Sequence, residues 1–254
     1  MPISFNEATR VFHLQGKSFS YCLYLDDALG LMNLYWGDRL PDGDLTYLMN
    51  GYWGGASFDS PASHAPHEAP TRGTGYYGTP AVCAMNEHGN DLVKLSYISH
   101  AIAAGKRKLE GLPAVYTESD AEATSLVITL ADPLTGLTVE LQYSVLEELD
   151  ALTRSMRLVN AGSENLTLTH MQSASVPLYG CDYDYINLNG GWARERVVCR
   201  NPIGRATVHV ESQRGASGHE QNPFIAACER TATEHSGSVW AMTLVYSGSF
   251  LATA

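Results

Sequence analysis

The chain has 254 residues, of which 44% are hydrophobic and 17% are charged, a balance that is typical of a folded protein and excludes an intrinsically disordered one. Its formal net charge of -11 argues against a nucleic-acid partner and against an anionic membrane, because both attract basic surfaces. No apolar run reaches the ~18 residues that a membrane-spanning helix needs.

The start of the chain, MPISFNEATRVF, lacks the basic region and the apolar stretch of a secretory signal. The five cysteines are odd in number, and none of them forms a C-x-x-C pair. This pattern predicts reduced thiols in a cytoplasmic protein. No G-x-S-x-G, P-loop or dinucleotide fingerprint is present, and we expect no cofactor.

In chain order, the first feature is the acidic pair in LDDALG (25–30), which is expected to form a turn. Residues 41–81 follow, a stretch rich in Gly, Pro, Ser and His that predicts a long irregular loop. Residues 124–145 alternate apolar and polar side chains on both sides of a Pro/Gly turn, which predicts a β-hairpin. A charged connection is expected at 145–152, and further strands are expected at 153–160, 165–176, 205–212 and 238–247.

The predicted fold class is all-β, with stacked antiparallel sheets and little helix, because short strands recur with turn signals between them. A single domain over residues 1–254 is compatible with this length, since large β domains reach about 250 residues.

Two histidines in SHAPHEAP raise the question of a metal site. His64 and His67 are three residues apart, whereas zinc-protease chemistry needs two histidines one turn apart on a helix. Pro66 and Pro70 forbid that helix, so we expect a solvated loop and no metal. The isolated His100, His170 and His219 are expected to be packing residues, as are most histidines in strand-like sequence.

Paired carboxylates would suit a glycosidase, which needs an acid and a nucleophile roughly 5–10 Å apart. Asp26 and Asp27 are neighbours, so on a strand they would point to opposite faces. Asp182 and Asp184 would share a face if the chain is extended there. Solvated loop acids are the preferred interpretation of both pairs.

The stretch GGWARERVV (190–198) combines a large aromatic side chain with two cations. In an extended chain Trp192, Arg194 and Arg196 point to one side, and Glu195 points to the other, where it can brace a backbone group or a cation. A tryptophan between arginines has the composition of an interface centre. The alternative is a surface ladder of ion pairs, worth ~0–1 kcal/mol each.

A second dense cluster is RGASGHEQNPF (214–224), where Arg214, His219 and Asn222 lie among glycines. A turn-rich polar segment of this kind is typical of a domain interface or a ligand rim. We therefore assign these three residues to the same predicted interface as Trp192, Arg194 and Arg196.

Six stretches in this order, FHLQGKSFSYCL, LYWGDRL, GKRKLEGLPAVY, GWARER, SQRGASGHEQNPF and LVYSGSFLA, carry a family resemblance. Together they resemble the N-terminal β-domain of α-galactosidases of glycoside hydrolase family 36, over roughly residues 10–252. The resemblance implies a β-supersandwich fold, followed in the intact enzyme by a catalytic barrel and a small C-terminal β-domain that this chain does not contain.

The resemblance also implies a retaining exo-glycosidase that removes terminal α-galactosyl groups from sugars such as melibiose and raffinose. Both catalytic aspartates of such enzymes lie in the barrel, so no catalytic residue is carried over to this chain. The chain alone is expected to be inactive, and its partners are its own barrel, a homo-oligomer that is a tetramer in many bacterial members, and α-galactoside sugars.

In those tetramers a loop of one N-terminal domain reaches the pocket of a neighbouring subunit, and by order along the chain that loop is 41–81. The resemblance places Asn50 where relatives have an aspartate and Trp53 where they have an aromatic residue. Tyr76 stands in place of an acid and Gly78 in place of an arginine, inside a GTG...PA frame that is kept. Asn50, Trp53 and Tyr76 are therefore the predicted sugar-contacting residues, although these departures weaken the expected match to galactose.

Two other functions remain open at the level of sequence. A stand-alone carbohydrate-binding module would need an aromatic platform, for which Trp53, Tyr76 and Tyr77 are candidates. An aldose-epimerase-like enzyme would need a histidine and a carboxylate in one pocket, and the spacing of these residues does not assemble such a pair.

Overall fold

The computed structural model describes residues 2–49, 60–63, 65–180 and 182–254. The predicted all-β class is confirmed, and these described residues form 16 strands in several antiparallel sheets. Helical structure in the described residues consists of four short 3-10 turns, Thr46–Leu48, Pro61–Ser63, Asp120–Glu122 and Glu147–Leu149. None of the described helices has the length and apolar character needed to cross a bilayer.

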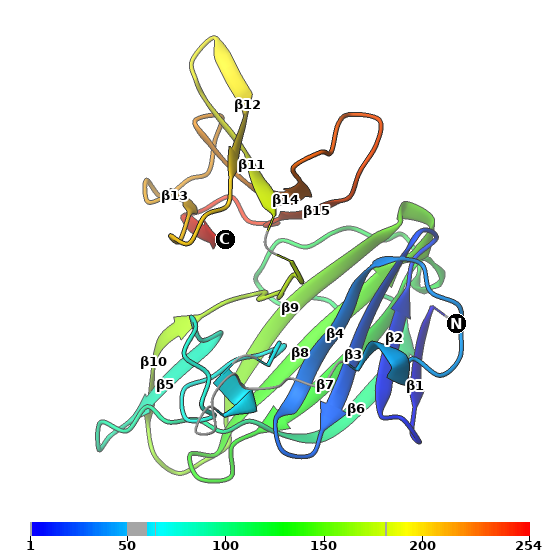
Figure 1. The fold of residues 1–254 in the computed structure, drawn as a ribbon. Helices are drawn as coiled ribbons and strands as arrows, with labels where there is room; N and C mark the ends of the chain where they lie inside the picture. Colours follow the sequence, from blue (N-terminus) through cyan, green and yellow to red (C-terminus); the bar gives the residue numbers. More distant parts are fainter. Residues whose placement is uncertain (1, 50–59, 64, 181) are drawn as a thin grey trace. The chain divides into compact units, whose positions relative to one another are not determined.

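The chain forms two compact units. Unit 1 comprises residues 1–107 and 116–178, and unit 2 comprises residues 108–115 and 179–254. Figure 1 shows their strands along the chain, from blue to red.

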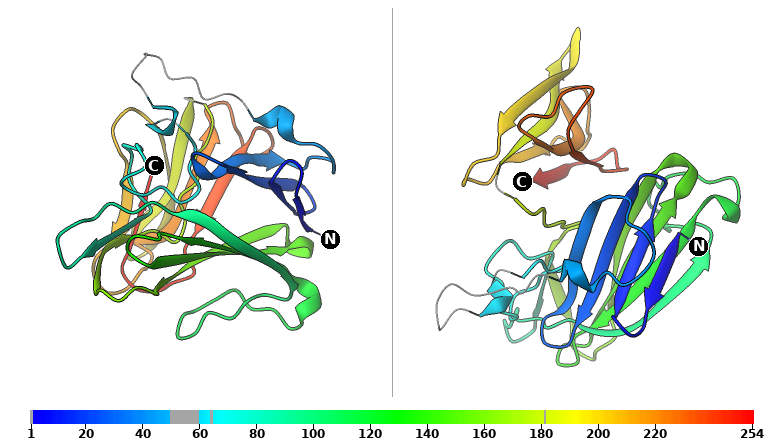
Figure 2. Two further views of the ribbon diagram at one scale, coloured as in Figure 1. Left: turned by 90° about the horizontal axis from the view of Figure 1, so that it is seen from below. Right: turned by 45° about the vertical axis from the view of Figure 1, so that its right-hand side comes forward.

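Unit 1 contains two four-stranded antiparallel sheets. The N-terminal sheet has the order β1-β2-β3-β4, with β1 (Ile3–Asn6), β2 (Val11–Gln15), β3 (Phe19–Asp26) and β4 (Gly30–Asp38). The central sheet has the order β6-β7-β8-β9, with β6 (Ser96–Ala104), β7 (Thr124–Ala131), β8 (Leu137–Leu146) and β9 (Ala151–Asn160). A further pair joins β5 (Val82–Asn86) to β10 (Leu166–Met171). Figure 2 shows the two large sheets as separate layers.

The core of unit 1 lies between the two large sheets. In β8, Leu137, Val139, Leu141, Tyr143 and Val145 are all buried, as period-two alternation predicts for the face of a strand that meets a core. They belong to one cluster with side chains of the N-terminal sheet, among them Phe12, Leu14, Tyr21 and Leu23. The predicted hairpin at 124–145 is therefore confirmed as β7 and β8.

The central strands of the N-terminal sheet, β2 and β3, are buried on both faces. All five residues of β2 are buried. The face of the sheet that points away from the core carries a second apolar cluster, in which Cys22, Met32 and Leu34 are joined by Leu45 and Ala65 from the segment after β4. Strands that are covered on both faces carry apolar side chains on both, as YCLYL (21–25) of β3 does.

Unit 2 is built on a four-stranded antiparallel sheet of order β12-β11-β14-β15, with β11 (Tyr183–Gly191), β12 (Arg194–Pro202), β14 (Gln221–Glu229) and β15 (Val239–Thr243). A smaller pair, β13 (His209–Ser212) with β16 (Phe250–Thr253), lies next to β14. Its buried residues Val210 and Phe250, together with Ala226 and Cys228 of β14, form the small interior of this unit.

Several predicted strands are shorter in the structure than in the sequence analysis. The strand expected at 165–176 ends at Met171, because Met171 already pairs with Val82, the first residue of its partner β5. The strand expected at 205–212 begins only at His209. The charged stretch 145–152 is, as predicted, a connection: a 3-10 turn at Glu147–Leu149 followed by Asp150 in the left-handed region, with φ 53°.

Candidate functional site

The stretch GGWARER forms the tip of a hairpin rather than one extended face. Gly191 pairs with Arg194, so Trp192 and Ala193 are a two-residue turn between β11 and β12. Trp192 is 88% exposed, and Figure 1 shows the hairpin extending beyond the other strands of unit 2. The predicted single face of Trp192, Arg194 and Arg196 is therefore wrong, because the turn removes Trp192 from the strand and Arg196 has a positive φ of 57° that breaks the alternation.

Two local features hold this hairpin in shape. A Cβ on Gly190 would lie 2.5 Å from the Arg194 carbonyl oxygen and 2.8 Å from the His219 carbonyl oxygen, so the backbone comes too close here for any side chain. The Ala193 N–H donates to Glu195 Oε1 at 2.9 Å. Backbone hydrogen bonds of this kind lower the pKa of Glu195, so its carboxylate braces the turn.

The structure brings the two clusters of predicted interface residues to the same end of unit 2. Asn189 pairs with Gln221, so the start of β14 lies beside the end of β11, and the His219 carbonyl oxygen approaches Gly190. His219 is exposed and Asn222 is half-buried in β14. Arg214 is exposed and pairs with Glu220 at 2.6 Å. Arg194 and Arg196 are exposed and form no ion pair within the described residues.

The acidic pairs that raised the glycosidase question are engaged in structural contacts. Asp26 Oδ1 accepts hydrogen bonds from the backbone N–H groups of Ala28 and Leu29, which confirms the predicted turn, and Asp27 pairs with Arg10. In unit 2, Asp184 accepts from Arg200 Nε at 2.7 Å. The same guanidinium donates to the carbonyl oxygens of Glu229, Arg230 and Ala232, so Arg200 ties β12 to the turn after β14.

The predicted loop 41–81 is far more ordered in its second half than its composition indicates. His67 forms an antiparallel bridge with Met32 of β4, and the Glu68 N–H donates to the Leu31 carbonyl oxygen at 3.0 Å. Thr71 forms a parallel bridge with Val82 of β5. Segment 65–71 therefore lies between the N-terminal sheet and β5, and the expectation that His67 is solvated is wrong because its side chain is buried. His64 lies outside the described residues.

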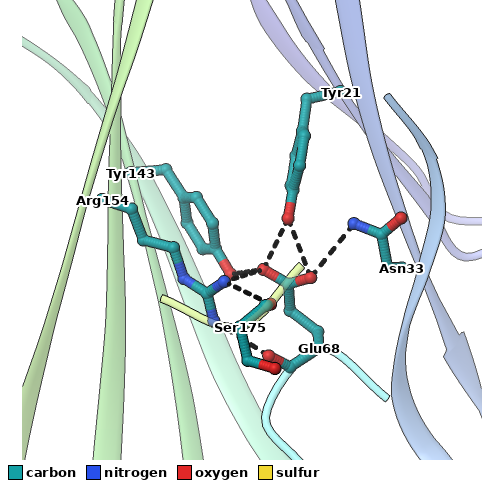
Figure 3. A network of polar contacts seen from close by, with 6 residues as sticks. All are labelled: Tyr21, Asn33, Glu68, Tyr143, Arg154 and Ser175. Atoms are coloured by element: carbon teal, nitrogen blue, oxygen red, sulfur yellow. Dashed lines mark hydrogen bonds and ion pairs between the residues drawn. The ribbon is translucent and has the colours of Figure 1, made fainter. Parts of the chain in front are cut away.

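Glu68 is the centre of a polar network inside unit 1, shown in Figure 3. Its side chain is completely buried. The hydroxyl of Tyr21 donates to its carboxylate at 2.9 Å, the hydroxyl of Tyr143 at 2.7 Å and the Asn33 amide at 3.2 Å. Arg154 Nη1 lies 3.0 Å from Oε1. One carboxylate thus collects donors from four strands of two sheets, β3, β4, β8 and β9.

The guanidinium of Arg154 has further partners besides the carboxylate. It also donates to the backbone carbonyl oxygens of Glu68 and Ser175, both at 2.9 Å, and lies over the Tyr143 ring. Burial alone would lower the pKa of Arg154, but the Glu68 carboxylate outweighs burial and raises it. Burial, and then the negative charge of Glu68, raise the pKa of Tyr21. The network is therefore one ion pair with two neutral tyrosines.

The sequence analysis gave Glu68 no role, although it lies between Pro66 and Pro70 in the same stretch as the histidines. Its partners are 35 to 86 residues away along the chain, so no local pattern marks it. Of the residues predicted to contact sugar, Tyr76 is half-buried with its ring 5.5 Å from the His67 ring, edge to face. Asn50 and Trp53 lie outside the described residues.

His13, Ser20 and Asp42 have an arrangement that superficially resembles a hydrolase triad. His13 Nε2 is 2.8 Å from Ser20 Oγ, and His13 Nδ1 is 3.9 Å from Asp42 Oδ1. Ser20 is completely buried, and its Oγ accepts a hydrogen bond from the Leu40 N–H. A nucleophile must reach its substrate, so this cluster acts as a structural latch that holds the segment after β4 against the N-terminal sheet.

We expect unit 1 to lose stability in mild acid, because burial lowers the pKa of His13, His67 and His100. A histidine whose pKa is depressed in the folded state takes up protons more readily when unfolded. The contribution of such a histidine to the free energy of unfolding is complete above its usual pKa of about 6.5. It is lost as the pH falls through the lower pKa of the folded state. Urea midpoints at pH 7.5, 6.5 and 5.5 measure this; a midpoint that rises toward pH 5.5 would contradict it.

The cavity beside segment 65–71 is too small for a sugar. The cavity near segment 65–71, lined by Leu29, Leu31, His67, Ala69, Thr71, Thr74, Leu95 and Leu130, has a volume of about 20 Å³, enough for one water molecule. Ligand pockets usually measure roughly 300–1,000 Å³. The described residues contain no group of three His, Cys, Asp or Glu side chains placed to hold a metal ion.

The fold and these residues define a class: an all-β protein built from several antiparallel sheets, with a buried ionic network in unit 1 and an exposed hairpin in unit 2. The sequence profile of the Glycosyl hydrolase family 36 N-terminal domain matches residues 30–254. The chain therefore belongs to this family, as the six sequence stretches predicted.

Named α-galactosidases and their crystal structures are similar to this chain, which supports the family assignment. The α-galactosidase AgaA of Geobacillus stearothermophilus is 38% identical over 99% of this chain. The crystal structure of AgaB from the same organism superposes with a TM-score of 0.90 over 100% of the chain, and that of a Lactobacillus brevis α-galactosidase with a TM-score of 0.92 at 31% identity. Variants of AgaA have been crystallised with raffinose and with stachyose.

This chain spans only about a third of the length of these proteins: 36% of AgaA, and 35% of the AgaB and Lactobacillus brevis chains. The similarity thus concerns their N-terminal part.

Proposed function

We propose that the chain is the non-catalytic N-terminal part of an α-galactosidase that hydrolyses terminal α-galactosyl groups of melibiose- or raffinose-type sugars. The observation that carries this proposal is the family match over residues 30–254, supported by the agreement in fold with α-galactosidases over the whole chain. Glycoside hydrolysis needs a proton donor and a nucleophile or base that share one cleft. The acids at 26, 27 and 184 are engaged with backbone groups or arginines, so the reacting pair is supplied by the catalytic part of the enzyme.

The experiment compares two purified samples on raffinose: the complete protein encoded by the gene, and residues 1–254 alone. We expect galactose release from the complete protein and none from residues 1–254. Release by residues 1–254, in a preparation that carries no other glycosidase, would contradict the non-catalytic role. A complete protein that leaves raffinose, melibiose and stachyose intact would contradict the α-galactosidase assignment.

The hairpin tip of unit 2 is the proposed contact with an adjoining surface, either the catalytic part or a sister subunit. Its support is the exposed Trp192 beside Arg194 and Arg196, together with the neighbouring segment that carries Arg214, His219 and Asn222. Aromatic and arginine side chains dominate the energy of many interfaces. Backbone bracing by Glu195 fixes the tip before it binds, which reduces the entropy lost on association.

We expect Trp192→Ala combined with Arg194→Ala to weaken assembly of the complete protein or to lower its melting temperature. Both side chains are exposed in this chain, so their loss should cost the isolated unit little. Analytical ultracentrifugation and calorimetry measure the two effects, with Arg205→Ala, an exposed arginine of the same unit, as the control. If assembly and melting temperature match those of the control, the proposal that the hairpin belongs to an interface is contradicted.

Segment 41–81 is the proposed rim of a neighbouring subunit's sugar site in a homo-oligomer, with Asn50, Trp53 and Tyr76 as the contacting residues. The proposal is supported by the anchoring of residues 65–71, which gives this segment a defined base. We also propose a cytoplasmic location, which is supported by the free thiols of Cys22, Cys83, Cys199 and Cys228.

A further inference from the structure

Segment 66–72 is attached to the body of unit 1 on both sides by its backbone. On one side the Asn33 N–H donates to the Pro66 carbonyl oxygen at 2.8 Å, and the Glu68 N–H donates to Leu31. On the other side the Ala81 N–H donates to the Pro70 carbonyl oxygen at 2.7 Å, and the Val93 N–H donates to the Arg72 carbonyl oxygen at 2.9 Å. The segment thus continues the N-terminal sheet beyond β4 and connects it to β5.

Backbone bonds alone do not fix which residue of an added strand faces the interior. A shift of one residue along β4 would keep the same kind of ladder and turn every side chain to the opposite face. Glu68 is the only acidic residue of segment 66–72, and Arg154 in the polar interior requires an acidic partner. Glu68 meets Tyr21 and Asn33 from one sheet and Tyr143 and Arg154 from the other.

A buried ion pair is not needed for stability as such, because well-packed apolar side chains often stabilise a core as well or better. What the pair adds is selectivity for one arrangement, since any other register would leave Arg154 without its counter-ion. Register selection is the best attested use of such buried polar groups.

The position of Glu68 is transmitted to the residues that follow. His67 is its direct neighbour, has a buried side chain, and is held through Nε2, 3.1 Å from the Ala62 carbonyl oxygen. The ring of His67 packs edge to face on the ring of Tyr76. Gly73 and Gly75, both at positive φ, turn the chain between these two rings. A shift of Glu68 would therefore move the surface on which Tyr76 rests.

We propose that Glu68 is a positioning residue: it sets the register of segment 66–72 against both sheets and, through His67, the presentation of Tyr76. This inference rests on the proposed function, in which Tyr76 belongs to the rim of a neighbouring sugar site. Glu68 itself is buried and touches no substrate.

The test uses Glu68→Gln in the complete protein and two readouts. Hydrogen exchange should become roughly tenfold faster or more at the amides of Asn33, Glu68, Ala81 and Val93, whose bonds hold the segment. The KM for raffinose should rise several-fold with little change in kcat, since a displaced rim weakens binding rather than chemistry. If Glu68→Gln fails to fold, Tyr143→Phe removes one of the donors and should shift both readouts in the same direction.

The control is Val139→Ala, a buried core residue of β8 outside the network. It should lower the melting temperature while leaving the KM and the relative exchange of segment 66–72 unchanged. Identical behaviour of Glu68→Gln and Val139→Ala would mean that Glu68 is an ordinary core residue, and would overturn the proposal.

Two further outcomes separate this inference from the proposed function. Unchanged exchange of the segment in Glu68→Gln overturns the positioning role whatever the activity. If exchange is faster but neither Glu68→Gln nor Tyr76→Ala changes the KM, the register role is supported and the proposed contribution of Tyr76 to a sugar site is contradicted.

Discussion

Replacing Arg154 by methionine is expected to lower the free energy of unfolding of unit 1 by about 3–5 kcal/mol, the usual cost of breaking a buried ion pair from one side. The variant would leave the carboxylate of Glu68 without its counter-ion at a place that water does not reach. It would also leave the carbonyl oxygens of Glu68 and Ser175 without the donors that Arg154 supplies. Urea unfolding followed by circular dichroism measures the change.

The same strand offers a matched control. Arg157 of β9 pairs with Glu140 at 3.2 Å, but its side chain is 59% exposed, against 8% for Arg154. Arg157→Met should cost no more than ~1 kcal/mol, because water replaces an exposed partner cheaply. Equal losses for the two variants would show that burial of the pair is not what makes Arg154 important.

Gly190→Ala is expected to destabilise unit 2 by about 1–3 kcal/mol or more, as overpacking against atoms that cannot move aside does. The added methyl group would meet the carbonyl oxygens of Arg194 and His219 and the backbone nitrogen of Arg196, all within 3.0 Å. These are main-chain atoms of β12 and of the turn before β14, so the clash can be relieved only if the hairpin opens at its base. Hydrogen exchange at the β11–β12 ladder measures the loss.

Its neighbour Gly191 is the natural comparison. There the nearest atom to an added Cβ is Arg194 Nε, in ordinary contact at 3.7 Å, and the backbone is not in the left-handed region. Gly191→Ala should be nearly neutral or slightly stabilising, since alanine loses less chain entropy on folding. A pair of variants that exchange equally fast would contradict the role given to Gly190.

The fold could be predicted from the sequence where one face of a strand meets the core and the other meets water. Residues 124–145 show this alternation and form β7 and β8. In β3 the alternation is obscured at residues 21–25, because the segment after β4 covers the outer face of the sheet and apolar side chains lie on both faces there. The family resemblance, which does not depend on alternation, identified this region through FHLQGKSFSYCL and LYWGDRL.

The candidate site was predictable in composition but not in geometry. Trp192, Arg194 and Arg196 were predicted as interface residues on one strand face. All three are exposed, but the turn at Trp192 and Ala193 was mistaken for strand, since neither residue is a typical turn former. His67 was expected to be solvated, because nothing local shows that its segment is added to a sheet. Glu68 could not be recognised at all, because only folding brings its partners to it.

The long sequence separations within the Glu68 network have a consequence for the order of events during folding. Tyr21 and Tyr143 lie 47 and 75 residues from Glu68 along the chain. The carboxylate can therefore be desolvated only after both sheets have formed. We therefore expect this network to form late in folding, and we expect the ion pair to slow unfolding. Weakening it would speed the loss of the native state while leaving the rate of its formation almost unchanged, which stopped-flow measurements on Glu68→Gln can decide.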